Sequence, residues 1–264
     1  MKCFLLRVGI DKGFGGCPAP IFEDGTFEYV PIPEINVTTE KRVYATMEGR
    51  KKRMVDLVPE KIKYSNPHYD PEFDSFTYGD PTKNKGRLKK LNSGDLLIFY
   101  AGLMRYEEPD DGKKWYKTKN HKSKLFVIGY FEVEKVFVFK KNAEENAENN
   151  IVSVKTTGEF NEEDYKSVIK ELSNNAHIKG YSKLRELGIK CPDEKLIIVK
   201  GNKSSKLFKK AIPLGGEDNK IPTDLVKVFG YEKNLTRASG CRIIEGETAS
   251  NVKKWIEKKS EEII

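Results

Sequence analysis

The hydrophobic positions of the first half of the chain either alternate with polar ones or form short apolar runs, and both patterns are typical of β-strands. Residues 2–8, 26–32 and 95–103 are predicted as strands, the last of them apolar almost throughout and therefore buried on both faces. Residues 124–139 start as an apolar run and continue as an alternating pattern, and Gly129 inside this run predicts a bulge or bend.

The second half of the chain changes to helical spacing. Apolar residues recur at helical intervals in 162–172, and 223–229 and 250–256 are also predicted as helices with plausible capping residues. Residues 196–199 are predicted to form a short buried strand, and residues 140–150 are predicted to form an exposed loop. We expect a mixed α+β fold with a β-rich, partly barrel-like core and helices mainly in the second half. The predicted core contains Leu5, Ile98, Phe99, Val127, Ile128, Val133, Ile197 and Ile198.

A glycine-rich loop follows the first predicted strand. Asp11 is followed by Gly13, Gly15 and Gly16, and prolines stiffen the chain on either side of the Asp24–Gly25 turn. Glycines allow backbone N–H groups to approach a ligand closely, so the loop is a candidate backbone cradle. A tight turn leading into an ordered loop explains the same residues. Cys17 in this loop is either a nucleophile or a buried structural thiol.

The net charge of +8 is concentrated in two basic clusters, at 83–90 and 113–124. The second contains Trp115 among its lysines, and cations with aromatic rings suit phosphates and unpaired bases. We expect an exposed hairpin there, and assign nucleic-acid contacts to Arg87, Trp115, Lys117, Lys119 and Lys122. The expected partner is DNA, RNA or a nucleotide. A solvated lysine-rich surface is the alternative.

The sequence contains no signal-peptide pattern and no apolar stretch of membrane-spanning length. Its four cysteines are scattered without a C-x-x-C pair, which argues against a structural zinc site and a disulfide framework. We therefore expect a cytoplasmic protein without a membrane partner.

His68 and Asp70 are separated by one residue, so on an extended segment their side chains project from the same face. Such a pair can act as an oriented general base or bind a metal. With His177 it matches, in order, the 2-His-1-carboxylate triad of non-haem iron oxygenases, for which Arg185 would anchor an oxo-acid cosubstrate.

The surroundings of the histidines argue against this iron site. His177 follows a helical stretch and the breaker at 173–175, whereas the triad's distal histidine belongs on a barrel strand. His68 lies between Pro67 and Pro71, as in a loop. We therefore assign no metal ligand and leave the cofactor unknown.

Four segments of the chain resemble the nucleotide modification associated domain 3 family. They are Asp11-x-Gly13-x-Gly15–Gly16-x-Pro18-x-Pro20 with its continuation to Pro33, His68-x-Asp70–Pro71, Gly94–Asp95–Leu96 through Gly102, and the segment ending at His177. Residues 76–92 depart from the family pattern. The resemblance implies a role in the hypermodification of DNA bases. Because the family-like segments lie on both sides of 140–150, residues 1–264 are expected to form one domain.

Two functions are consistent with these residues. In the first, the protein is an enzyme on a nucleotide or nucleic-acid base; Asp11, His68 and Asp70 are catalytic, and Gly13, Gly15, Gly16, Cys17 and His177 bind substrate. In the second, it is a non-catalytic reader of a modified or flipped base. The turn at 93–95 and the strands after it resemble the barrel core of the PUA superfamily, and Phe14, Tyr78, Tyr100 and Trp115 would stack on bases.

Overall fold

The computed structural model describes residues 1–81, 83–109, 114–117, 122–140, 153–156, 165–189, 195–215, 220–230 and 242–261. Within these ranges nine strands form one mixed sheet, and two short strands form a second. Lys140, the first residue of the predicted 140–150 loop, ends a strand, and the rest of that loop lies outside the described ranges, as do Lys119, His121 and Cys191.

The centre of the large sheet consists of β1 (Lys2–Arg7), β6 (Leu96–Arg105) and β7 (Lys124–Lys140). β1 runs parallel to β6, and β6 runs antiparallel to β7. The register between β6 and β7 shifts next to the pair formed by Phe99 and Gly129, which confirms the bulge predicted at this glycine. Every residue of β6 except Arg105 is buried, as its apolar sequence predicts.

The remaining strands extend the sheet on both sides. They are β2 (Ala19–Ile21), β5 (Thr77–Asp80), β8 (Ser153–Thr156), β9 (Lys195–Gly201), β10 (Lys206–Gly215) and β11 (Arg242–Glu245). The main strand order is β11-β1-β6-β7-β9-β5, so the sheet ends on β11 and β5. Because these two end strands do not pair with each other, the sheet is open. The mixed α+β class is therefore confirmed, whereas the described strands do not form a closed barrel and a PUA-like core is not confirmed.

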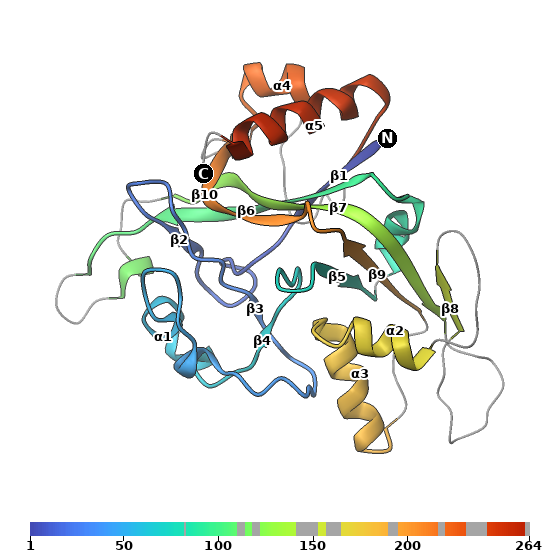
Figure 1. Ribbon diagram of the computed structural model, residues 1–264. Helices are drawn as coiled ribbons and strands as arrows, with labels where there is room; N and C mark the ends of the chain where they lie inside the picture. The colour runs from blue at the N-terminus through green and yellow to red at the C-terminus, as the bar shows by residue number, and fades with distance from the viewer. Residues whose placement is uncertain are drawn as a thin grey trace.

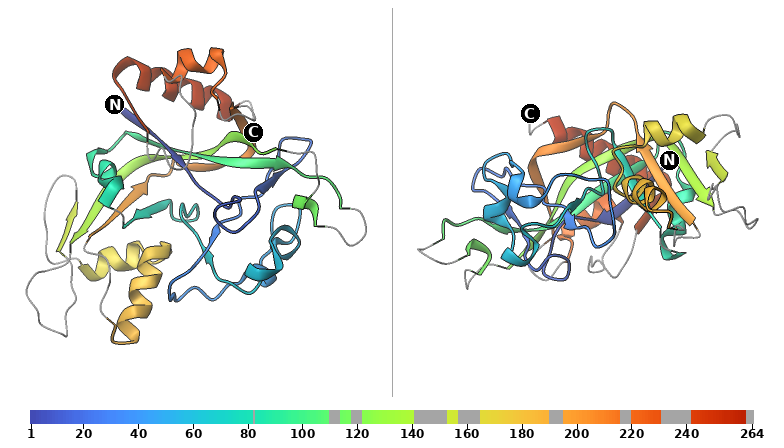
Figure 2. Two further views of the ribbon diagram at one scale, coloured as in Figure 1. Left: turned by 180° about the vertical axis from the view of Figure 1, so that it is seen from behind. Right: turned by 90° about the horizontal axis from the view of Figure 1, so that it is seen from below.

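Helices and loops cover the two faces of the sheet unequally (Figures 1 and 2). On one face α5 (Gly246–Glu261) packs beside α4 (Thr223–Phe229) and against β1. On the other lie the loops of the first 75 residues, with α1 (Met54–Leu57) and the small β3 (Ile32–Pro33) and β4 (Pro67–His68) pair. Short 3₁₀ helices span Tyr44–Thr46, Glu60–Ile62, Lys83–Lys90 and Trp115–Lys117.

The helices α2 (Tyr165–Glu171) and α3 (Ala176–Glu186) lie on the same side as these loops, near β5 and β9. A separate apolar cluster joins them to the sheet, and it contains Phe137, Phe139, Leu172, Ile178, Leu196 and Ile198. This packing fixes the first turn of α3 relative to β9. All eight predicted core residues are buried, which confirms that part of the sequence analysis.

The continuous strand predicted at 26–32 is wrong, and only its last residue, Ile32, lies in a strand, β3. Thr26 and Phe27 form only isolated bridges, and the residues between Glu28 and Pro31 have no regular structure. Pro31 in this segment has no backbone N–H and therefore cannot donate a hydrogen bond to a neighbouring strand. The carboxylate of Glu28 is buried and accepts the backbone N–H groups of residues 50–52, so this segment anchors a neighbouring loop.

No helix of the described ranges combines the length and the apolar character required to cross a bilayer.

Candidate functional site

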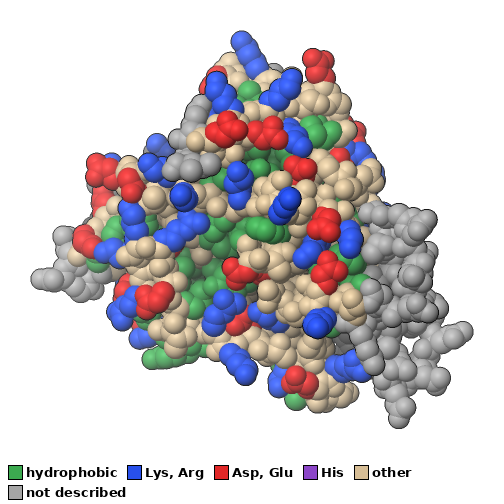
Figure 3. Space-filling view, in the orientation of Figure 1, with side chains coloured by type: hydrophobic (Ala, Val, Ile, Leu, Met, Phe, Trp, Pro, Cys, Tyr) green, Lys and Arg blue, Asp and Glu red, His purple; other side chains and the backbone are tan. Residues whose placement is uncertain are grey.

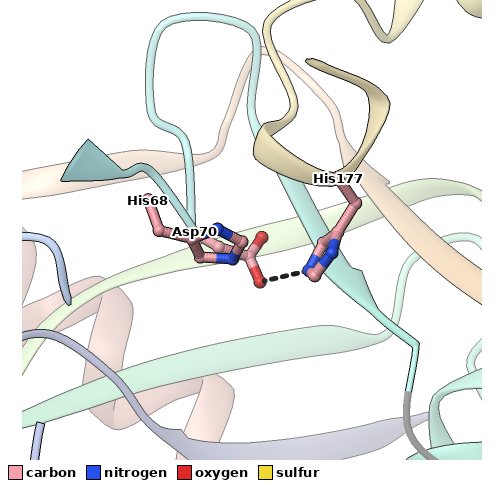
Figure 4. Close-up of side chains that lie close together, drawn as sticks. All are labelled: His68, Asp70 and His177. Atoms are coloured by element: carbon pink, nitrogen blue, oxygen red, sulfur yellow. Dashed lines mark ion pairs between the residues drawn. The ribbon is translucent and has the colours of Figure 1, made fainter. Parts of the chain in front are cut away.

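His68, Asp70 and His177 converge on one point between the β4–β5 segment and the start of α3 (Figure 4). One potential metal-ligand atom from each residue lies within 4.8 Å of the other two. The rings of His68 and His177 are 4.8 Å apart between centroids and meet edge to face. The prediction that His68 and Asp70 project from one face is thus confirmed, and a third residue from a distant part of the sequence joins them.

The short β3–β4 pair positions His68. Its register places His68 opposite Ile32, two residues before Glu34. The Nδ1 of His68 lies 2.5 Å from Oε2 of Glu34, whose other oxygen accepts the N–H groups of Ile35 and Asn36. A carboxylate only accepts hydrogen bonds, so Nδ1 carries the proton. In the neutral ring, Nε2 therefore keeps its lone pair.

The charges around His68 and Glu34 reinforce their interaction. Burial by itself lowers the pKa of His68, but the hydrogen bond with Glu34 and the charges of Asp70 and Glu34 raise it above its usual value. For Glu34, burial by itself raises the pKa, but the contact with His68 and the two backbone N–H groups lower the pKa overall. Glu34 is thus held as a carboxylate that orients the His68 ring.

Asp70 lies between the two histidines. Its Oδ1 accepts the N–H of Gly79 in β5 at 2.7 Å, and its Oδ2 is 3.6 Å from Nε2 of His177. Gly79 also lies close against His177, because a Cβ at this position would overlap the histidine Cδ2. A glycine is required here so that the β5 backbone can contact both Asp70 and His177.

The N-terminus of α3 positions His177. Asn175 is the N-cap, and its side chain accepts the backbone N–H of His177 at 3.0 Å. The same buried side chain donates to Thr77 Oγ1 in β5. The segment 173–175, predicted as a helix breaker, therefore contains the cap that starts α3 and ties it to the sheet.

A second set of contacts attaches α3 to the loop that joins β3 to β4. Lys179 in α3 lies 2.7 Å from Glu40, which also accepts two side-chain hydrogen bonds from Arg42. These contacts hold the pKa of Glu40 far below its usual range, against the effect of burial. The helix that carries His177 is therefore fixed at its cap, along one side and through its apolar face.

The arrangement allows two kinds of chemistry. Side-chain exposures of 13% for His68, 7% for Asp70 and 15% for His177 place the group at the edge of solvent. A histidine oriented by a carboxylate can transfer protons. Two imidazoles and one carboxylate can also hold a single cation. His177 does not lie on a barrel strand, as the sequence indicated, but the N-terminus of α3 places it beside His68 and Asp70 all the same.

The predicted cosubstrate anchor, Arg185, does not join this group. It lies exposed near the C-terminal end of α3, whereas His177 is in the first turn of this helix. Eight residues of α-helix span about 12 Å, so the two side chains belong to different ends of the helix.

The glycine loop is explained by packing. Asp11 accepts the N–H groups of Gly13 and Phe14 within the loop, at 2.9 and 2.8 Å, and lies 3.7 Å from Arg7. Gly15 and Gly16 have positive φ angles, and a Cβ on Gly15 would overlap Ile10. The conformation and packing of the loop are therefore enough to explain why Asp11, Gly15 and Gly16 stand at these positions. The catalytic role of Asp11 and the backbone cradle stay predictions.

Cys17 faces the protein interior. Its thiol donates to the carbonyl of Leu57, and burial raises its pKa to about 12, an effect that Lys61 only partly offsets. A protonated, buried thiol is a weak nucleophile. The structure agrees with the alternative of a buried thiol, and the substrate contact of Cys17 stays a prediction.

The basic stretch around Trp115 differs from the predicted hairpin. Trp115 is only 1% exposed and donates its indole N–H to the Leu57 carbonyl at 3.2 Å, so its predicted exposure for base stacking is wrong. Arg87, Lys117 and Lys122 are exposed, and their nucleic-acid contacts stay predictions. On the face shown in Figure 3, basic side chains are interspersed with acidic ones.

Sequence reasoning did not identify Glu34, Gly79 or Asn175. A polar residue before a helix is a recognisable cap signal, and this signal was present at Asn175. Glu34 and Gly79 carried no comparable signal, because their role depends on strand pairing that joins distant segments.

A protein-family model described as nucleotide modification associated domain 3 matches residues 2–245. This range contains every residue of the site described above. No curated protein and no solved structure matches the chain.

Proposed function

The chain belongs to the nucleotide modification associated domain 3 family, and on that basis we propose that it is an enzyme that modifies a nucleotide or a nucleic-acid base. The proposed reaction centre consists of His68, Asp70 and His177. The observation that carries the proposal is the convergence of these three side chains, from two distant segments, at a partly buried point.

The support of these side chains favours a reactive role over a structural one. Each is held by a dedicated partner: Glu34 for His68, the Gly79 N–H for Asp70, and the Asn175 cap for the backbone of His177. Preorganised side chains at the edge of solvent are typical of reaction centres. We assign His68 and His177 to proton transfer or ligand binding, and Asp70 to orienting His177. The proposed substrate is a base in DNA, or its free nucleotide.

The alternative, a non-catalytic reader of a modified or flipped base, requires accessible aromatic rings. Of the four rings predicted to stack on bases, Tyr78, Tyr100 and Trp115 are buried, and Phe14 is 47% exposed. The described sheet is also open and not a barrel. These observations favour the enzyme.

Nucleoside mass spectrometry tests the proposal. DNA and free nucleotides from cells that produce the chain are digested to nucleosides and compared with those from cells that produce Asp70→Asn. We expect a nucleoside that depends on the wild-type chain. Its yield should fall by about 100-fold or more in the variant, because Asp70 orients His177 and general acid–base groups contribute on the order of 10²–10⁴ in rate.

Asp56→Asn is the matched control, because Asp56 is an exposed aspartate whose side chain contacts Arg53. This variant should retain the wild-type yield. Identical nucleoside profiles for the wild-type chain and Asp70→Asn, with both proteins folded and equally abundant, would contradict the proposed function.

A further inference from the structure

We propose that His68, Asp70 and His177 bind one divalent first-row transition-metal ion, a proposal that rests on the proposed function because it assigns a cofactor to the same centre. Its basis is geometric: three ligand atoms of two different chemical types lie within 4.8 Å of one another. Metal–ligand bonds of about 2.0–2.2 Å bring such atoms about 3–4 Å apart, so modest side-chain rotations complete the site.

The donor set selects the class of metal. Mg²⁺ and Ca²⁺ prefer oxygen ligands, and octahedral or larger shells of them. Two imidazole nitrogens and one carboxylate oxygen suit Mn²⁺, Fe²⁺, Co²⁺ or Zn²⁺ instead. Three protein ligands also leave coordination positions for water or a substrate atom, which is the arrangement of catalytic rather than structural metal sites.

Glu34 provides independent support. Histidine ligands usually donate their second ring N–H to a carboxylate or carbonyl, which fixes the ring and makes the ligating nitrogen more basic. Glu34 accepts from Nδ1 of His68 at 2.5 Å and is itself held by two backbone N–H groups. Nε2 of His68 is therefore the nitrogen left to bind the ion.

The surrounding contacts preorganise the other two ligands. Oδ1 of Asp70 is bound to the Gly79 N–H, so Oδ2, on the side of His177, is the oxygen available to the ion. The backbone of His177 is fixed by Asn175, and the ring is held against Gly79. The Oδ2 of Asp70 and Nε2 of His177 lie 3.6 Å apart, longer than a normal hydrogen bond.

Titration of the chelator-treated full chain with Co²⁺ tests the site, because coordinated Co²⁺ produces visible d–d absorption without any substrate. We expect one Co²⁺ per chain. His177→Gln should weaken the affinity by more than about 100-fold, since loss of a ligand exceeds the 10–100-fold effect typical of an outer partner. Glu34→Gln should weaken it by about 10–100-fold.

His121→Gln is the matched control, because it removes the only histidine of the chain outside the proposed ligand set. It should bind Co²⁺ as the wild type does, and thermal unfolding verifies that all variants are folded. Absence of stoichiometric binding, or equal binding by His177→Gln and His121→Gln, overturns the metal site. Co²⁺ binding without an Asp70-dependent nucleoside would overturn the proposed function alone, and such a nucleoside without metal binding would overturn the metal alone.

Discussion

Trp115→Ala is expected to lower the free energy of unfolding by about 3–5 kcal/mol, the range for loss of a large aromatic side chain from a core. Trp115 is fully enclosed, donates to the Leu57 carbonyl and packs against the rings of Tyr106 and Tyr116. The substitution would leave a cavity between α1 and the 3₁₀ helix that contains Trp115, and would remove one of the two hydrogen bonds to the Leu57 carbonyl. Urea unfolding followed by circular dichroism measures the change.

Lys117→Ala provides the comparison, because Lys117 lies two residues away and is exposed. Surface substitutions of this kind change stability by about 0.5 kcal/mol or less. If Trp115→Ala were as stable as Lys117→Ala, the indole would have to lie at the surface, as the sequence pattern had indicated.

Gly79→Ala is expected to reduce Co²⁺ affinity by about 10–100-fold, the range for disturbed partners of metal ligands. The added Cβ would occupy the position of the His177 Cδ2 atom, so the ring would have to move away from Asp70. The Gly79 N–H that binds Asp70 would shift with it. Product formation should fall in the same proportion, because both readouts depend on the same three side chains.

Gly86→Ala separates this effect from the general consequences of replacing a glycine. A Cβ at Gly86 would meet no atom within 4 Å, so metal affinity should not change. Equal Co²⁺ affinity for the two variants would mean that Gly79 does not position His177. Urea unfolding of both variants identifies any loss that comes from global destabilisation.

The large elements of the fold could be predicted because their apolar patterns are strong. The long apolar runs of β6 and β7 and the helical spacing of α4 were correctly identified. The open sheet could not be predicted, because strand order depends on pairings such as β1 with β11 that join the two ends of the chain. The strand predicted at 26–32 failed because a buried carboxylate and prolines override the local pattern.

The residues of the candidate site could be predicted from the sequence, but the contacts that bring them together could not. One-residue spacing correctly placed His68 and Asp70 on one face. The addition of His177 depends on Gly79, which lets α3 approach β5, and on Asn175, which begins that helix at the required position. The charge pattern was a less reliable guide to exposed residues, because Trp115 within the basic stretch is buried in the core.

The central claim is that His68, Asp70 and His177 form one centre able to bind a ligand. Nitrogen NMR of the imidazole rings tests this most directly, because the chain has only three histidines. On addition of one equivalent of Zn²⁺, we expect Nε2 of His68 and Nε2 of His177 to shift together to metal-bound values, with the His121 signals unchanged. A shift of only one of these two rings, or of neither at saturating Zn²⁺, would contradict the claim.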